Sequence, residues 1–230
     1  MTTIQSRLGA VHDRIHAACL ASGRAVDTVS LLAVSKTFGP DAVQAAHQAG
    51  QTAFGENYIQ EAVQKILALR HLPLQWHCIG PVQSNKSRLV AEHFDWVHTV
   101  DRLKLAQRLS EQRPTNLAPL QVCIQVNVDA GQTKSGVRPE QALALAQALA
   151  ALPRLRLRGL MCIPEPAPDF VASCAVFERT RALFDALNAE GLGLDTLSMG
   201  MSADLEAAIA SGSTMVRVGS AIFGQRDYPV

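Results

Sequence analysis

The stretch LLAVSKTFGPDAVQAAHQAG, from Leu31 to Gly50, contains the unit on which the whole fold is built. Its first residues have the continuous apolar character of a buried strand, and this run ends in a lysine, Lys36. Pro40 then opens a helical pattern, and Gly50 stands where a helix commonly ends. The stretch therefore predicts a strand over 30–35 that is followed at once by a helix over 40–50.

The same pair of elements returns along the rest of the chain. Strands are expected over 52–57, 74–80, 96–100, 120–128, 155–164 and 195–200, and an eighth strand over 214–224 closes the series. Helices are expected after them, over 58–70, 83–94, 101–113, 139–152, 169–191 and 201–212. One further helix, over 3–21, precedes the first strand.

Eight nearly continuous apolar strands joined by helices imply a parallel sheet that is covered by those helices. The sequence therefore predicts an α/β fold in which residues 1–230 form a single (β/α)₈ barrel domain with an extra N-terminal helix. The alternative is an open, doubly wound sheet, because the order of the strands in space is not visible in the sequence.

Composition narrows the partners and the compartment. The chain has 21 basic and 20 acidic side chains, so it lacks the charged field that attracts nucleic acid or an anionic membrane. No apolar run approaches the roughly 18 residues that a spanning helix needs, and the polar N-terminus does not resemble a secretion signal. The five cysteines are odd in number and widely spaced, which is typical of reduced core residues. We therefore expect a cytoplasmic protein, and its self-contained barrel favours a monomer.

In a barrel of this type, chemistry is carried by residues at the carboxyl ends of the strands. Lys36 stands there, and an amine at an apolar barrel mouth can act as a nucleophile toward an aldehyde. A surface lysine is the alternative. The other strand-end candidates are Glu56, Asn57, Ser84, Asn85, Lys86, Asn127, Lys134, Pro164, 199–202 and 217–220. Lys65 and Lys104 lie within predicted helices and are expected to face solvent.

The last two strands end in GMS (200–202) and RVGSAIFG (217–224). Barrels commonly hold phosphate at this position, where glycine allows close approach of the backbone and serine supplies a hydroxyl. Ordinary turn chemistry is the alternative. Together with Lys36, these loops indicate a phosphorylated aldehyde as the ligand.

Six segments resemble the pyridoxal phosphate homeostasis protein family over nearly the whole chain. They are LLAVSK, FGENYIQEA, WHCIGPVQSNKSRLVAEHFDWVHTVD, KSGV, LRGLMCIP and LSMGMSADLEAAIASGSTMVRVGSAIFG. The resemblance implies a barrel like the N-terminal domain of alanine racemase, with pyridoxal 5′-phosphate (PLP) held as a Schiff base on the lysine that follows the first strand.

By this resemblance, Lys36 is the Schiff-base lysine and Arg217 is the partner of the pyridine nitrogen. The phosphate ligands are Ser202, Gly219 and Ser220, and Asn57 lies beside the ring. An ion pair of Arg217 with Asp204 or Glu206 is the structural alternative for that arginine. Lys134 corresponds to another family lysine near the mouth. The chain departs from many relatives at Phe38, where they have a second lysine.

The resemblance implies a non-catalytic protein that keeps intracellular PLP, the active form of vitamin B6, in balance, with PLP-dependent apoenzymes as its candidate acceptors. The rival hypothesis is a PLP-dependent amino-acid racemase or decarboxylase. Those enzymes use an additional β domain and, in the racemases, a tyrosine from a second subunit, whereas this chain ends soon after the eighth strand and has only Tyr58 and Tyr228. A third hypothesis is a phosphosugar aldolase that uses Lys36.

Overall fold

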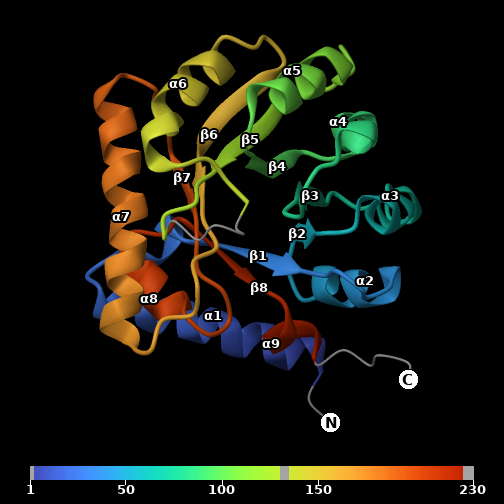
Figure 1. Cartoon of the computed structure of the whole chain (residues 1–230). Helices are drawn as coiled ribbons and strands as arrows, with labels where there is room; N and C mark the ends of the chain where they lie inside the picture. Colours follow the sequence, from blue (N-terminus) through green and yellow to red (C-terminus); the bar gives the residue numbers. More distant parts are fainter. Residues whose placement is uncertain (1–2, 130–134, 225–230) are drawn as a thin grey trace.

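The computed structural model describes residues 3–129 and 135–224, and its eight strands form one closed barrel in the order β1 to β8. All neighbouring strands are parallel, and β1 pairs with β8 to close the barrel (Figure 1). The strands are β1 (Ser30–Val34), β2 (Ala53–Glu56), β3 (Gln75–Cys78), β4 (Trp96–Val100), β5 (Leu120–Gln125), β6 (Leu155–Met161), β7 (Thr196–Ser198) and β8 (Met215–Val218). The predicted barrel is confirmed, and the alternative of an open sheet is wrong.

The helices lie around the outside of the strands (Figure 1). They are α1 (Ile4–Ala21), α2 (Pro40–Gln48), α3 (Ile59–Ala68), α4 (Ser87–His93), α5 (Leu103–Gln112), α6 (Pro139–Ala150), α7 (Phe170–Ala189), α8 (Leu205–Ala210) and α9 (Ser220–Phe223), with short 3₁₀ turns η1 (Val26–Thr28) and η2 (Ser84–Lys86). The predicted N-terminal helix is confirmed as α1, which packs against α2, α8 and α9.

The period-two alternation of β1 sorts its side chains between two cores. Leu31 and Ala33 belong to the large core between the strands and the helices. Leu32 and Val34 belong to a small cluster with Ile79 from the β3 end and Met215 from β8, inside the barrel. Lys36 continues the inward series of Leu32 and Val34, so the alternation directs its side chain toward the barrel mouth.

The eighth predicted strand is shorter than expected. It ends at Val218, because the Gly219 carbonyl accepts hydrogen bonds from the N–H groups of Ile222 and Phe223, at 2.9 and 3.0 Å, and so starts the turn α9. The prediction that residues 1–230 form one domain stays a prediction. Within the described part of the chain, no helix is both long and apolar enough to cross a bilayer.

The strands β6 and β7 approach each other closely at Gly159, and a substitution there tests this packing. A Cβ atom at this position would overlap the carbonyl oxygen of Thr196, which is backbone and cannot turn aside. We expect Gly159→Ala to lower the free energy of unfolding by about 2–4 kcal/mol, measured by urea denaturation. Gly9→Ala is the control, because nothing lies within 4 Å of its Cβ position in α1, and it should stabilise the chain by up to about 1 kcal/mol. Equal effects of the two variants would contradict the close packing described here.

Candidate functional site

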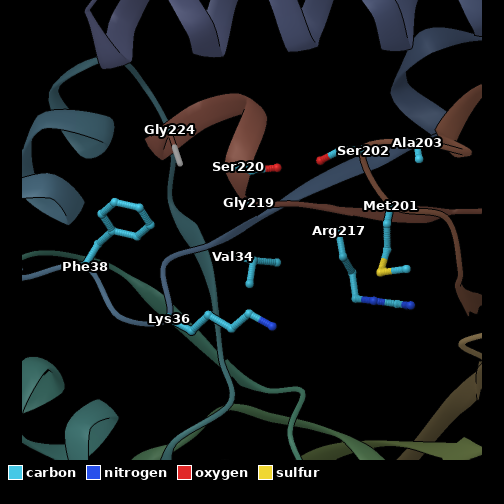
Figure 2. A pocket seen from close by; sticks show the side chains of 10 residues that line it. All are labelled: Val34, Lys36, Phe38, Met201, Ser202, Ala203, Arg217, Gly219, Ser220 and Gly224. Carbon is cyan, nitrogen blue, oxygen red and sulfur yellow. The ribbon is translucent and has the colours of Figure 1, made fainter. Parts of the chain in front are cut away.

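A cavity of about 580 Å³ opens at the carboxyl ends of β1, β7 and β8. Its lining residues are Val34, Lys36, Phe38, Met201, Ser202, Ala203, Arg217, Gly219, Ser220 and Gly224 (Figure 2). Five of the six residues predicted from the sequence as ligands of the cofactor therefore surround one cavity. Its volume lies within the range of roughly 300–1,000 Å³ that is usual for small-molecule sites.

Lys36 follows β1 in a tight turn. The Phe38 N–H donates to the Ser35 carbonyl at 3.1 Å and closes this turn around Lys36 and Thr37. Thr37 has φ 69°, in the left-handed region that a β-branched residue rarely adopts, and this conformation costs about 1–3 kcal/mol. The Lys36 side chain extends from the turn into the cavity, toward Arg217 (Figure 2).

The outer side of the same turn contacts a buried ion pair. Lys65, on α3, is 3% exposed, and its Nζ donates to Glu56 Oε1 at 2.6 Å and to the Ser35 carbonyl at 2.9 Å. The expectation that Lys65 faces solvent was therefore wrong. Burial raises the pKa of Glu56, while the nearby Lys65 ammonium opposes this rise. The sequence signal for this pair is the position of Lys65 next to Ile66 on the apolar face of α3, opposite a strand-end acid.

Arg217 is held inside the barrel by neighbouring strands. Its NH1 donates to the Ser198 carbonyl at 2.6 Å and to Ser198 Oγ at 2.8 Å, and its NH2 donates to the Cys162 carbonyl at 2.9 Å. Burial lowers the pKa of Arg217, but the group stays charged at neutral pH. These bonds use three of the five guanidinium N–H donors, so two remain for a ligand within the described structure.

The alternative role for Arg217, an ion pair with Asp204 or Glu206, is not found among the described residues. Glu206 pairs with Arg14 of α1 at 2.8 Å, and Asp204 Oδ1 accepts the Met201 N–H at 2.6 Å. Arg14 also donates to the Ser202 carbonyl at 3.0 Å. Both acids therefore brace the loop after β7, and the buried arginine faces the cavity instead.

Beyond Arg217, a chain of hydrogen bonds between uncharged side chains continues through the barrel interior. Ser198 Oγ lies 2.8 Å from His98 Nδ1, and His98 Nε2 lies 2.9 Å from His77 Nδ1. His77 Nε2 then lies 3.0 Å from Gln75 Oε1. Because Ser198 Oγ accepts from Arg217, its own hydrogen points to His98, and each following N–H points away from the arginine. Burial lowers the pKa of His77 to about 3 and the pKa of His98 well below its usual value, so both rings are neutral at neutral pH.

The remaining predicted ligands sit on two loops. Ser202 follows β7, and Gly219 and Ser220 follow β8. Figure 2 shows the hydroxyl oxygens of Ser202 and Ser220 pointing toward one another across the cavity. A Cβ atom at position 219 would lie 3.1 Å from the Val34 carbonyl oxygen, so glycine allows the turn after β8 to pack closely against the end of β1.

Asn57 lies outside this cavity. It lines two adjoining hollows of about 250 and 300 Å³, and its buried Oδ1 has no hydrogen-bond partner among the described residues. Lys86 lines the second hollow, and Lys134 lies outside the described residues. Phe38, where many relatives have lysine, stacks on Phe223 of α9 with ring centroids 5.2 Å apart.

The residues around the cavity form a chemically coherent set. Lys36 offers an amine that can react with an aldehyde, and Arg217 offers a permanent cation to a ring nitrogen or an anion. The hydroxyls of Ser202 and Ser220, beside Gly219, can donate hydrogen bonds to a phosphate. These groups fit PLP. Sequence reasoning missed Ser198, His98 and Lys65, because their roles depend on contacts between distant segments.

The alanine racemase N-terminal domain family matches residues 12–227 of the chain. A protein of Pseudomonas aeruginosa called pyridoxal phosphate homeostasis protein is 60% identical over 228 residues, which cover 99% of this chain and 98% of that protein. The protein of the same name from Escherichia coli K12 is 53% identical over 231 residues, 99% of each chain.

Solved structures agree with this relationship. PipY of Synechococcus elongatus, solved with PLP bound, is 37% identical with a TM-score of 0.83, and the match covers 96% of this chain and 100% of that one. An alanine racemase of Clostridium difficile is 17% identical with a TM-score of 0.71 over 88% of this chain and 53% of that one, which shows a shared fold.

The buried histidines predict how stability depends on pH. His77 takes up a proton near pH 6.5 when unfolded but only near pH 3 when folded, so the unfolded state binds more protons between these values. Stability should therefore fall as the pH falls through this window, by up to about 1.4 kcal/mol per pH unit for each such histidine. Urea denaturation measures the free energy of unfolding at each pH. Between pH 6 and 4, His77→Gln should reduce the slope of this free energy against pH by the contribution of about one proton.

His12→Gln makes the same chemical change at an exposed position of α1 and serves as the control. An unchanged slope in His77→Gln would mean that His77 is already charged in the folded protein.

Proposed function

Because the chain belongs to the pyridoxal phosphate homeostasis protein family, we propose that it binds PLP in the cavity at β1, β7 and β8 and maintains the intracellular supply of vitamin B6 without catalytic turnover. The observation that carries the proposal is the meeting of Lys36, Arg217 and the two serine hydroxyls in one cavity (Figure 2).

Each residue has a role that follows from its chemistry. Lys36 Nζ takes the aldehyde, and the Ser202 and Ser220 hydroxyls with the Gly219 backbone hold the phosphate. Arg217 donates a hydrogen bond to the ring nitrogen, while a place for Asn57 beside the ring is supported by the family resemblance alone, because Asn57 lines neighbouring hollows. When bound, PLP supplies an aldehyde and an electron-poor ring.

The charge of Arg217 disfavours the carbanion chemistry of transaminases. A guanidinium donates hydrogen bonds and cannot accept one, so it keeps the ring nitrogen unprotonated and makes the ring a poorer electron sink. The His98–His77 chain stabilises the charged arginine, because its neutral acceptors direct their negative ends toward it.

The lining of the cavity bears on the racemase alternative. Racemization needs a base on each face of the substrate carbon. Among the described lining residues, Lys36 is the single side chain that can serve as a base, since the others are apolar residues, glycines, serines and an arginine. Tyr58 is exposed and lines a neighbouring hollow, and Tyr228 lies outside the described residues.

The proposal includes a cytoplasmic monomer whose acceptors are PLP-dependent apoenzymes. All five cysteines are free, as in a reducing compartment, and the barrel closes on the strands of a single chain.

Borohydride reduction of the protein loaded with PLP tests the role of Lys36. We expect peptide mapping to find the pyridoxyl group on Lys36, and Lys36→Ala to lose the covalent product. The exposed Lys104 of α5 is the control, because Lys104→Ala should retain full labelling at Lys36. Full labelling of the Lys36→Ala protein at another lysine would refute the assignment.

Turnover assays test the absence of catalysis. With a panel of L- and D-amino acids, we expect racemase, decarboxylase and transaminase rates far below the roughly 1 per second of ordinary enzymes. Transfer of PLP to an apoenzyme, followed by the recovered activity of that enzyme, serves as the positive readout for the loaded protein. Turnover at ordinary rates would assign the protein to the enzymes of this fold.

A further inference from the structure

We propose that Glu56, Glu61 and Lys65 act as positioning residues for Lys36: together they hold the turn after β1 so that the Lys36 amine meets the aldehyde of the ligand. We call these three residues the β1 latch. The inference rests on the proposed function, since it concerns the attachment of PLP to Lys36.

The β1 latch lies on the outer side of the barrel wall. Lys65 belongs to α3, and its contacts with Glu56 of β2 lie between the sheet and that helix. Lys36 extends from the opposite side of the same backbone, into the cavity (Figure 2). None of the three latch residues lines that cavity, so their effect on a ligand there must pass through the backbone of the turn.

The contacts of the β1 latch converge on the two residues that flank Lys36. On the preceding residue, Lys65 Nζ binds the Ser35 carbonyl at 2.9 Å, and the Ser35 hydroxyl donates to Glu56 Oε1 at 2.6 Å. On the following residue, the Thr37 N–H donates to Glu61 Oε1 at 2.9 Å. Lys65 Nζ joins the two sides, because it also contacts Glu61 Oε1 at 3.3 Å.

The conformation of Thr37 explains why the turn needs these contacts. A β-branched residue at φ 69° persists only where surrounding contacts determine its backbone. The bond from the Thr37 N–H to Glu61 is such a contact. If it were lost, the peptide between Lys36 and Thr37 could rotate, and the direction of the Lys36 side chain would change with it.

The energetics of the buried pair also favour a positioning role over a purely stabilising one. A buried ion pair contributes little net stability compared with apolar residues of similar volume. Here the pair also leaves Glu56 Oε2 buried without a hydrogen-bond partner in the described structure. What the pair does supply, together with Glu61, is a set of directional hydrogen bonds to Ser35 and Thr37, the residues on both sides of Lys36.

The reaction that depends on this position is the attachment itself. A carbon–nitrogen double bond forms between the aldehyde carbon and unprotonated Nζ, and the aldehyde oxygen leaves as water. A displaced amine slows this step without changing how the phosphate and ring are held. Misplacement of a reacting group by about 1 Å can cost about 100-fold in rate.

The Lys65→Met variant is used to measure the covalent attachment of PLP separately from non-covalent binding in the cavity. Two ligands are compared: PLP, and pyridoxine 5′-phosphate, which keeps the phosphate and ring but has no aldehyde. We expect pyridoxine 5′-phosphate affinity within about twofold of the parent, while the attachment rate of PLP, followed by mass spectrometry after borohydride quenching, falls at least about tenfold. Lys104→Met makes the same chemical change on an exposed helix position and should alter neither quantity.

Glu61 offers a second, less buried site for the same test. Glu61→Gln keeps an oxygen that can accept the Thr37 N–H and should attach PLP within about threefold of the parent, whereas Glu61→Met removes the acceptor and should be at least about tenfold slower. If Lys65→Met leaves too little folded protein, Lys65→Met combined with Glu56→Gln removes the unpaired buried charge and is measured in its place.

The outcomes are distinct. Parent-like attachment in folded Lys65→Met and Glu61→Met would overturn the inference. Equal losses for PLP and for pyridoxine 5′-phosphate would also overturn it, because they would mean general disruption of the cavity. If the parent chain itself failed to bind PLP or to attach it at Lys36, the proposed function would fail instead.

Discussion

The pairing of β1 with β8 is the contact on which the rest of the structure depends. Ser30 to Ala33 pair in register with Met215 to Val218, and this ladder converts a row of eight strands into a closed barrel. The same ladder brings the residue after β1, Lys36, next to residues of β8 and its following turn, which lie far away along the chain. The amine, the buried cation and the glycine of the cavity are neighbours because the barrel is closed.

Closure also determines how a charge is tolerated inside the barrel. Arg217 projects into an interior from which bulk water is excluded, so its charge must be met by oriented dipoles. The carbonyls of Cys162 and Ser198, with the Ser198 hydroxyl, meet it directly. The neutral histidines behind Ser198 complete the chain. A cation satisfied by dipoles rather than by a carboxylate keeps its attraction for an electron-rich ligand atom, which suits a protein that holds a cofactor.

The turn after β1 is constrained from two directions. On the cavity side, Phe38 stacks on Phe223 and couples the turn to α9, which begins at the proposed phosphate ligands. On the outer side, the β1 latch holds Ser35 and Thr37. A turn fixed in this way can present Lys36 in one direction although Thr37 is strained. Binding by this protein would then depend on a preorganised amine more than on movement of the loops.

The sequence by itself determined the repeated strand-then-helix units and the strand ends that carry chemistry. Apolar runs and helical periodicity are local properties, so the amino-acid order alone was enough to select Lys36, Ser202, Arg217 and Gly219. The resemblance to a family added their expected roles. Only the tertiary structure decided that Lys65 is buried, that Ser198 and His98 stand behind Arg217, and that Asn57 lines a neighbouring hollow. These facts depend on which distant segments the closed barrel brings together, because burial and hydrogen bonding are set by neighbours in space and not by neighbours in the chain.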